Sequence, residues 1–394
     1  MKRIAIVLAL IITISSAAGI YLETRYRNDI QVQRLFSRFS TLANDRILET
    51  ANSLRQKGTP ESLQQAISLY RDAISRDPKN PFRWCDLGLA LAESKEIEEA
   101  RSCYEQAAKL GPNKSETLWK VVDFYQHIGE PQKALRYASH ILEIDNAAAG
   151  SMFYQYLETG FDFGDTLRFG IPRSKPIAQA YMRYVIRNGN MDKAALCWDW
   201  ISSLSFVDDQ LIAEYLAFLI RIGNPAKAWN TWIGYTHKGT EANLVYNSSF
   251  ESVPTKSPFD WNISRIAGVE VERDSGIRHE GAWSLKITFD GKENPAYRHV
   301  SQNVFLEAGT YHFGGFLRAE GITSDKGIAF RIGSFQTDQV TGSCDWKELE
   351  QAFEIREPSL IRVEVFRRAS ERFANKIAGN VWIDDLTLTK LTKP

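Results

Sequence analysis

The chain has 394 residues, and its 48 lysines and arginines are balanced by 48 aspartates and glutamates. This length allows two or three domains, and the zero net charge argues against a surface built to bind nucleic acid. Hydrophobic residues make up 44% of the chain and charged residues 24%, which is typical of globular rather than disordered proteins. The four cysteines show no CxxC or other metal-ligand spacing, so the sequence indicates no zinc site.

Residues 1–40 predict a membrane anchor followed by a charged stalk. A short positive segment precedes the uncharged run Ile4 to Leu22. These 19 residues, each rising about 1.5 Å in a helix, come close to the roughly 30 Å hydrocarbon core of a bilayer. The small residues Ser16 to Ala18 leave open that a signal peptidase removes the segment. We therefore expect a single-pass protein of the bacterial inner membrane with its bulk in the periplasm, or a secreted protein after cleavage.

Residues 81–112 carry the spacing of two antiparallel helices joined by a short turn. Gly88 and Ala100 are small where the two helices approach, and Pro112 ends the second helix. The pattern resembles the tetratricopeptide repeat, a helical hairpin of thirty-four residues. The residues that carry this resemblance are Trp84, Leu87, Gly88, Leu91, Ala100, Tyr104, Ala107 and Pro112.

The same spacing recurs on both sides of this hairpin, with alanines at intervals of 34 residues. Such periodicity is typical of a solenoid that buries a continuous core between neighbouring repeats. The register breaks over 147–176, which we interpret as an insertion or a distorted repeat. The sequence thus predicts a solenoid of five repeats within residues 41–242. The recurring alanines are Ala66, Ala100 and Ala134, and then Ala194 and Ala228.

In the family that this region resembles, the first helices of successive repeats line a concave groove that commonly binds peptides or protein partners. The resemblance therefore implies a protein partner. Arg183 and Arg187 stand four residues apart, so both project from one helix face and could meet an acidic side chain or a C-terminal carboxylate. Simple exposure to solvent is the alternative for each residue. The groove candidates are Trp119, Asp123, Gln126, Arg183, Arg187 and Arg221.

Two cysteines of the best hairpin are expected to lie level with each other. If Gly88 faces Ala100, then Cys85 and Cys103 are equidistant from the turn between the helices. In an oxidising compartment the two could form a disulfide, and two buried free thiols are the alternative. The sequence leaves both open.

From Asn243 onward the hydrophobic period changes from 3.6 residues to 2. Residues 310–318 and 361–366 alternate between apolar and polar side chains as half-buried strands do. This pattern predicts an antiparallel β-sandwich over residues 243–394. The expected fold class is therefore a multidomain chain, α and then β, with an N-terminal transmembrane helix, an α-solenoid and a C-terminal sandwich.

Four segments of the sandwich region, taken in order, carry a second resemblance. They are similar to the jelly-roll carbohydrate-binding modules that accompany xylan- and glucan-degrading enzymes. The likeness covers nearly the whole region and implies a jelly roll with a polysaccharide ligand. The segments are 243–251, 280–287, 300–311 and 381–388.

Modules of this kind often contain a structural calcium ion, and the positions that match its ligands are Glu251 and Asp384. Asp384 shares strand parity with Leu386 and Leu388, so we expect its carboxylate to point inward, where an unpaired charge would be costly. Calcium, a hydrogen-bond network with the first strand and a salt bridge are three ways to compensate that charge.

Sugar binding requires aromatic faces for stacking, surrounded by polar groups. Strand alternation separates Phe316 from the core residues of its own strand, and Phe366 likewise. We expect these two rings to share one outer face as a stacking platform among charged residues, with Tyr297 on a loop nearby. The predicted glycan-binding residues are Phe316, Arg318, Arg331, Phe366 and Tyr297.

The sequence predicts a non-enzyme, because it shows no G-x-S-x-G elbow, P-loop, HExxH or dinucleotide motif. Adjacent aspartates such as 384–385 face opposite ways on a strand and do not form a glycosidase pair. We expect a membrane-tethered extracytoplasmic scaffold that binds a protein through its solenoid and a glycan through its sandwich, in polysaccharide synthesis, export or envelope assembly. A pure protein-interaction scaffold without a sugar ligand is the alternative, and an accessory module for a catalytic partner chain is a third hypothesis.

Overall fold

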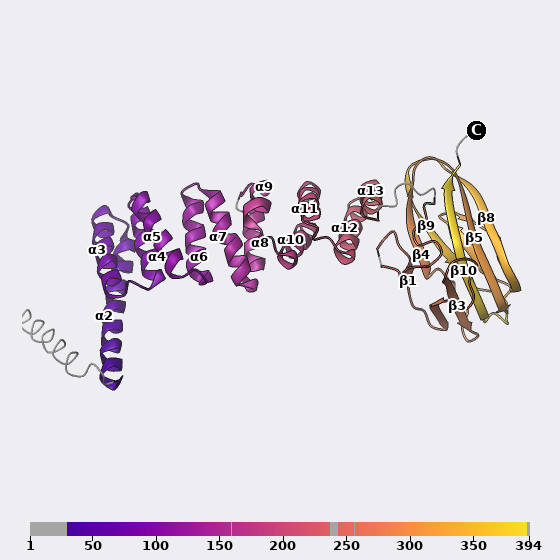
Figure 1. Ribbon diagram of the computed structural model, residues 1–394, viewed down its shortest axis with the longest axis horizontal. Helices are drawn as coiled ribbons and strands as arrows, with labels where there is room; N and C mark the ends of the chain where they lie inside the picture. The colour runs from indigo at the N-terminus through magenta and orange to yellow at the C-terminus, as the bar shows by residue number, and fades with distance from the viewer. Residues whose placement is uncertain (1–29, 159, 237–242, 256, 392–394) are drawn as a thin grey trace, which may run out of the picture. The chain divides into compact units, whose positions relative to one another are not determined.

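The computed structural model describes residues 30–158, 160–236, 243–255 and 257–391. Helices come first and two antiparallel sheets follow, as expected from the change of hydrophobic period (Figure 1). The chain divides into two compact units, 1–177 and 178–394. The expected membrane segment, Ile4 to Leu22, lies outside the described residues. Within the described ranges, no helix combines the length and the apolar character needed to cross a membrane.

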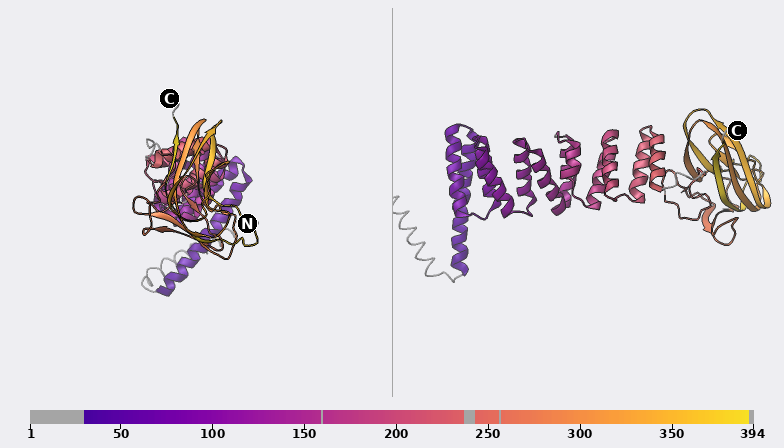
Figure 2. Two further views of the ribbon diagram at one scale, coloured as in Figure 1. Left: turned by 90° about the vertical axis from the view of Figure 1, so that its right-hand side faces the viewer. Right: turned by 45° about the horizontal axis from the view of Figure 1, so that its top comes forward.

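The helices of the first unit form antiparallel pairs, which the right-hand view of Figure 2 shows side on. Proline at the first helical turn and a side-chain cap start several of them, as with Thr59 before α3 and Asn80 before α4. The regular helices are α2 (Ile30–Lys57), α3 (Pro60–Arg76), α4 (Pro81–Glu93), α5 (Ile97–Leu110), α6 (Ser115–His127) and α7 (Pro131–Ile144).

Close packing between α4 and α5 depends on Gly88. A β-carbon at this position would lie 2.9 Å from a ring carbon of Tyr104 and 3.3 Å from the β-carbon of Cys103. Gly88 therefore faces Tyr104 and Cys103 rather than Ala100, which corrects the expected register of this hairpin. Cys85 and Cys103 are free thiols, and burial raises the pKa of Cys85 to about 12 and that of Cys103 to about 11. The structure therefore has two buried free thiols at these positions and no disulfide between them.

The register break over 147–176 is a distorted repeat. Helix α8 (Ala149–Glu158) occupies the place of a first helix, after the 3₁₀ turn η1 (Asn146–Ala148). In place of a second helix stand the single turn α9 (Phe163–Asp165) and the π-helix η2 (Thr166–Gly170), which packs against α7. A β-carbon at Gly170 would lie 2.9 Å from a methyl carbon of Leu135. Glycine thus permits the close approach on which this irregular hairpin depends.

The second unit begins with two further hairpins in the expected register. Gly189 and Gly223 take positive φ angles of 77° and 81° in the intra-hairpin turns, a conformation that glycine adopts without strain. Asn190 and Asn224 follow them and accept hydrogen bonds from the next turn as N-caps. The helices are α10 (Lys175–Arg187), α11 (Met191–Ser203), α12 (Asp209–Arg221) and α13 (Pro225–Thr236).

The sandwich consists of two five-stranded antiparallel sheets. We call them sheet A, with strand order β1-β4-β9-β6-β7, and sheet B, with order β2-β3-β10-β5-β8. Sheet A contains β1 (Asn262–Ile263), β4 (Val300–Leu306), β6 (Ala329–Ile332), β7 (Phe335–Gln336) and β9 (Ser359–Phe366). Sheet B contains β2 (Val269–Asp274), β3 (Ser284–Asp290), β5 (Gly309–Ile322), β8 (Gly342–Ile355) and β10 (Ala378–Lys390).

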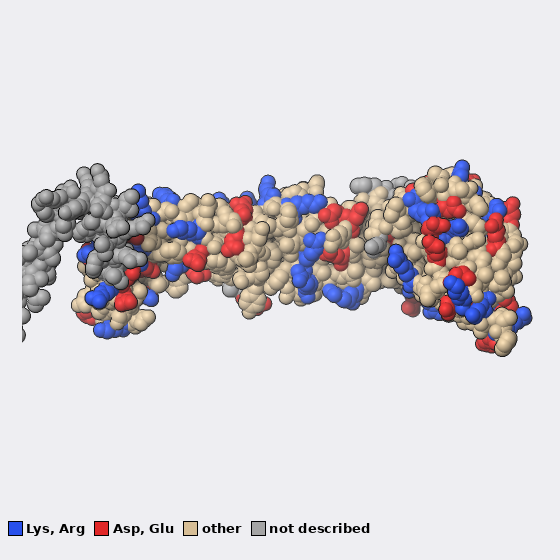
Figure 3. All heavy atoms as spheres, turned by 90° about the horizontal axis from the view of Figure 1, so that it is seen from below, with Lys and Arg blue, Asp and Glu red and all other residues tan. Residues whose placement is uncertain are grey.

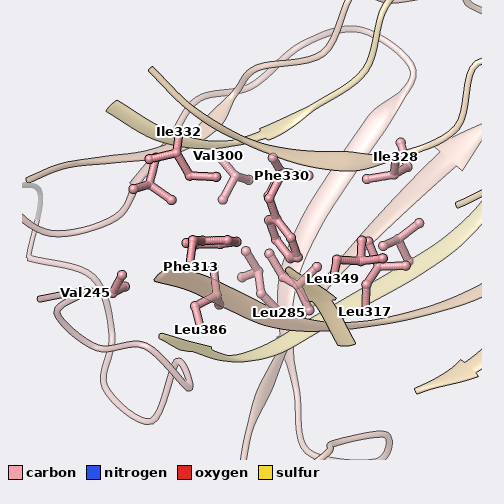
Figure 4. Close-up of a cluster of buried hydrophobic side chains, with 14 of the residues drawn as sticks. Val245, Leu285, Val300, Phe313, Leu317, Ile328, Phe330, Ile332, Leu349 and Leu386 are labelled. Atoms are coloured by element: carbon pink, nitrogen blue, oxygen red, sulfur yellow. The ribbon is translucent and has the colours of Figure 1, made fainter. Parts of the chain in front are cut away.

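The core of the sandwich lies between the two sheets (Figure 4). Phe313 on sheet B meets Phe330 on sheet A edge to face, with ring centroids 5.3 Å apart. Helix α13 adds to this core from outside, since Trp229 packs against it and meets Phe259 at 5.1 Å. Trp232 on the same helix meets Tyr246 at 4.9 Å. The last helix and the sandwich therefore share an aromatic contact within the second unit.

Candidate functional site

A row of polar side chains crosses the outer face of sheet A. On β9, Val363 and Val365 point into the core, so alternation turns Glu364 to the outer face. Strand pairing places Ser301 and Arg331 in register with it on the two adjacent strands. These residues in turn pair with one residue on each edge strand of the sheet. Strands lie about 4.8 Å apart, so the row spans about 19 Å. Across the sheet, in order, the row is Asn262, Ser301, Glu364, Arg331 and Gln336.

Glu364 is the centre of this row, and it is only 3% exposed although it lies on the outer face. Its carboxylate forms an ion pair with Arg331 on one side and with Arg362, at 3.6 Å, on the other. Arg362 also donates a hydrogen bond of 2.7 Å to the hydroxyl of Ser301. A buried carboxylate is tolerable when it is paired in this way. One carboxylate stands against two guanidinium groups, which leaves one positive charge on this face.

Phe366 lies beside the row but does not present a bare ring. It is 5% exposed, and the guanidinium carbon of Arg331 lies 4.1 Å from its ring centroid. This is a cation–π contact, in which the ring supports the guanidinium plane from below. Phe305, the other aromatic side chain on the outer face of the sheet A strands, is also buried. Polar and charged groups, and not aromatic rings, are therefore what this face offers to a ligand.

The five predicted glycan-binding residues do not share one surface, so the expectation of a common platform is wrong. Arg331 and Phe366 belong to sheet A, whereas Phe316 and Arg318 lie on β5 of sheet B. Tyr297 is fully buried in the core between the sheets. Alternation along a strand predicts which residues share a face of that strand, and it does not say to which sheet the strand belongs.

Phe316 does not present a free ring for stacking on a sugar, because another side chain of the protein covers it. The His279 imidazole stacks on it with ring centroids 3.7 Å apart and planes at 14°. His279 in turn contacts the Asp385 carboxylate through Nδ1, at 2.6 Å. Arg318 pairs with Glu320 at 2.8 Å. The sheet B candidates are thus engaged in contacts within the domain.

The two expected calcium ligands are held by one loop. Asp384 Oδ2 accepts hydrogen bonds from the backbone of His279, at 2.9 Å, and of Glu280, at 3.3 Å. Glu251 Oε1 accepts from the backbone of Ala282, at 2.8 Å, and of Trp283, at 3.1 Å. These contacts make residues 279–283 a cradle of N–H donors for two carboxylates. The hydrogen bonds that compensate the Asp384 carboxylate thus come from this loop, and not from the first strand as in the expected network.

The predicted orientation of Asp384 is wrong for a local reason. A bulge after this residue, with Asp385 at φ 46°, turns Leu386 and Leu388 inward and leaves Asp384 on the outer side of sheet B. It is nonetheless fully buried, and burial raises the pKa of its carboxyl to about 6. Among the described residues, no group of three or more His, Cys, Asp or Glu is placed to hold a metal ion. Calcium at Glu251 and Asp384 stays a prediction.

The repeat region contains a second candidate site, between α10 and α12. Arg183, Arg187 and Arg221 lie together there around a pocket of about 390 Å³. Arg183 pairs with Glu214 at 2.7 Å, whereas neither Arg187 nor Arg221 has a carboxylate partner among the described residues. In Figure 3 basic side chains gather over the stretch from α10 to α12. The remaining lining residues of this pocket are Ile186, Ala217 and Phe218.

The other three groove candidates lie on α6, in the first unit. Asp123 is exposed, and Trp119 and Gln126 are partly buried. The Gln126 side chain accepts a hydrogen bond of 3.1 Å from Gln155 on α8, so its amide already has a partner. None of these three residues lines the arginine pocket.

Sequence reasoning missed two arginines that matter here. Arg362 precedes Glu364 by two positions, and the same alternation that separated Phe366 would have placed it on that face. Arg367 is different, because it is almost fully buried and binds the loops at one end of the sandwich through Lys326 O and Asn294 Oδ1, each at 3.0 Å. No local pattern predicts a buried arginine, since arginine is almost always exposed unless paired.

Comparison with known proteins bears on the helical part first. Residues 81–114 match the tetratricopeptide repeat model. This is the hairpin of α4 and α5, and the neighbouring hairpins repeat its architecture. A search of curated proteins found no match.

Solved structures resemble both parts of the chain. The TmCBM61 structure with β-1,4-galactotriose is 21% identical over 38% of this chain and 100% of its own, with a TM-score of 0.29. The CBM22-1 xylan-binding domain of Paenibacillus barcinonensis Xyn10C is 16% identical over 37% of this chain and 94% of its own, with a TM-score of 0.26. PilW, a type IV pilus biogenesis factor, is 17% identical over 50% of this chain and 96% of its own, with a TM-score of 0.27. Likeness at this level carries no information about the ligands of this chain.

Proposed function

We propose that the protein is a tethered, non-enzymatic scaffold whose tetratricopeptide repeat region binds a protein partner and whose sandwich binds a glycan on the outer face of sheet A. The uncharged run Ile4 to Leu22 supports the tether, and both parts resemble binding modules rather than catalytic domains. A place in polysaccharide synthesis, export or envelope assembly follows from joining these two kinds of binding in one chain.

The polar row on sheet A carries the glycan proposal. A sugar chain offers hydroxyl groups on all sides, and amide, hydroxyl and guanidinium groups bind them by hydrogen bonds. Here such groups stand on four of the five adjacent strands, in register with the Glu364 carboxylate of β9, from Asn262 at one edge to Gln336 at the other. Glu364 holds Arg331 and Arg362 in place, so the donors are oriented before a ligand arrives.

The glycan site is tested with the full-length protein in affinity electrophoresis against a panel of soluble polysaccharides. We expect retardation by at least one member of the panel and its loss in Arg331→Ala. Phe316→Ala, on sheet B, is the matched control and should migrate like the wild type. Circular dichroism verifies that both variants fold. Loss of binding in Phe316→Ala but not in Arg331→Ala would place the site on the other sheet and refute the proposal.

The arginine pocket between α10 and α12 carries the partner proposal. Arg187 and Arg221 lack carboxylate partners among the described residues, and both are exposed beside the buried apolar side chains of Phe218 and Ile186. Guanidinium groups in such a setting bind a carboxylate strongly. We expect the partner to place an acidic side chain or its C-terminal carboxylate here.

Co-purification from membranes tests the partner site. The double variant Arg187→Glu/Arg221→Glu should lose the partner that cross-links to the wild-type chain. Arg173→Glu, an exposed arginine before α10, makes a charge reversal outside the pocket and should retain that partner. A partner retained by the double variant would show that this pocket is not where it binds. Retention of a partner together with no glycan binding in the electrophoresis would favour the alternative of a pure protein-interaction scaffold.

A further inference from the structure

We propose that the ligand of sheet A is an acidic polysaccharide, one whose sugars carry carboxylates as uronic acids do. This inference rests on the proposed glycan function and specifies the chemistry of its ligand. It follows from what the outer face of sheet A lacks, from the charges it carries, and from the contrast with sheet B.

Neutral sugars in water are held largely by stacking on aromatic rings, because hydroxyl hydrogen bonds to solvent must be replaced one for one. Sheet A offers no such ring among its described strands. Phe305 is buried, and Phe366 is covered by the Arg331 guanidinium. A ligand that approaches Phe366 therefore contacts the Arg331 guanidinium and not the aromatic ring beneath it.

The guanidinium groups are arranged to accept an anion. Arg362 has a side chain that is 53% exposed, and the Ser301 hydroxyl and Glu364 hold its guanidinium from below. The Arg331 side chain is 25% exposed over Phe366. Glu364 compensates one of the two positive charges, which leaves one for the ligand. A planar guanidinium fork binds a carboxylate through two parallel hydrogen bonds, which a sugar hydroxyl cannot form.

The two sheets differ in charge in a way that favours an anion only on sheet A. The strands of sheet A contain two arginines and one glutamate. The strands of sheet B contain eleven acidic and five basic residues. Charge of one sign over a surface repels like-charged ligands and attracts opposite ones at a distance. An acidic chain is therefore repelled by sheet B and admitted by sheet A.

The experiment compares two probes, polygalacturonate as the acidic polymer and xylan as a neutral one, with the full-length protein by isothermal titration. We expect tighter binding of polygalacturonate, weakened as salt is raised from 50 to 500 mM because exposed charges are screened. Arg362→Gln should weaken that binding at least about tenfold, because a hydrogen bond between two charged groups is stronger than one from a neutral amide. Lys347→Gln removes the same charge from exposed β8 of sheet B and should not weaken it.

Each outcome bears on one of the two proposals. Equal or tighter binding of xylan overturns the acidic ligand and leaves the glycan site intact. Binding that ignores salt, or an equal effect of Arg362→Gln and Lys347→Gln, also overturns it. Binding of neither probe, nor of the polysaccharide panel, refutes the glycan function itself. Circular dichroism melts of both variants separate a lost contact from a lost fold.

Discussion

Glu364 is a buried charge, which is costly for stability, and it also orients the two arginines of the candidate site. Its carboxylate is buried on the side of a sheet that faces solvent, and two guanidinium groups make this tolerable. Replacing Glu364 by alanine leaves both cations without their shared partner. We expect Glu364→Ala to lower the free energy of unfolding by about 1–3 kcal/mol, because it removes charged hydrogen-bond contacts while both remaining guanidinium groups reach solvent.

Urea denaturation followed by tryptophan fluorescence measures this loss. Glu320→Ala is the matched control, because Glu320 also pairs with an arginine, Arg318, but its side chain is 46% exposed. An exposed pair contributes less than about 1 kcal/mol, so this variant should unfold near the wild-type midpoint. Similar losses in the two variants would mean that Glu364 is not the buried partner described here.

Asp384 makes a prediction about pH. Burial raises the pKa of its carboxyl from 3.8 to about 6, so the folded chain holds a proton that the unfolded chain has released in that window. The contribution of this group to stability is therefore present below pH 4 and is lost as the pH rises toward 6. The neighbouring Asp385 carboxylate also raises this pKa, whereas the backbone N–H groups of His279, Glu280 and Asp385, which donate to the Asp384 carboxylate, lower it.

The difference between wild type and Asp384→Asn isolates this contribution, because asparagine keeps the shape without the charge. Thermal melts between pH 4 and 7 should show the wild type losing melting temperature relative to the variant as pH rises. A constant difference would contradict the raised pKa. The same melts at pH 7 with calcium or a chelator test the calcium prediction, since a metal at Asp384 and Glu251 would raise the melting temperature of the wild type alone.

At the scale of single elements, the hairpin of α4 and α5 depends on a close approach that only glycine permits. A β-carbon at Gly88 would come within 2.9 Å of Tyr104, which is itself buried and cannot move away. We expect Gly88→Ala to destabilise the first unit by about 1–3 kcal/mol, as overpacking does.

Gly150 on α8 is the matched control for this prediction. A β-carbon there meets nothing within 4 Å, so Gly150→Ala should be neutral or stabilise by up to about 1 kcal/mol through helix propensity. Chemical denaturation of both variants measures the contrast. Equal destabilisation would show that the helical glycines matter for a reason other than packing.

The elements also show how far sequence could predict this protein. Local period and repeat spacing predicted the hairpins, the break after Asn146 and the change to strands, because these features depend on neighbours in sequence. They did not predict that Phe316 and Phe366 lie on different sheets, since that depends on pairing between distant strands. The orientation of Asp384 failed for a smaller reason, a single bulge that reverses parity. Helical spacing placed Arg183 and Arg187 on one helix face, and both line the pocket with Arg221.

At the scale of the whole molecule, the division of the chain does not follow the change of secondary structure. The compact unit 178–394 includes two helical hairpins together with the sandwich. Trp229 and Trp232 on α13 make the aromatic contacts with Phe259 and Tyr246 that join them. A repeat hairpin is stabilised mainly by its neighbours, so loss of this contact should be felt on both sides.

We therefore expect α12, α13 and the sandwich to unfold together in one transition of a calorimetric scan. In the double variant Trp229→Ala/Trp232→Ala that transition should split or fall by several degrees, because each large aromatic side chain lost costs about 3–5 kcal/mol. Trp200→Ala, on α11, removes a partly buried tryptophan away from this contact and should shift the transition without splitting it. Two independent transitions in the wild type would contradict the coupling. One shared transition would mean that a partner bound at Arg187 and Arg221 and a ligand bound on sheet A stabilise the same cooperative unit, so that binding at one site raises the unfolding temperature measured for the other.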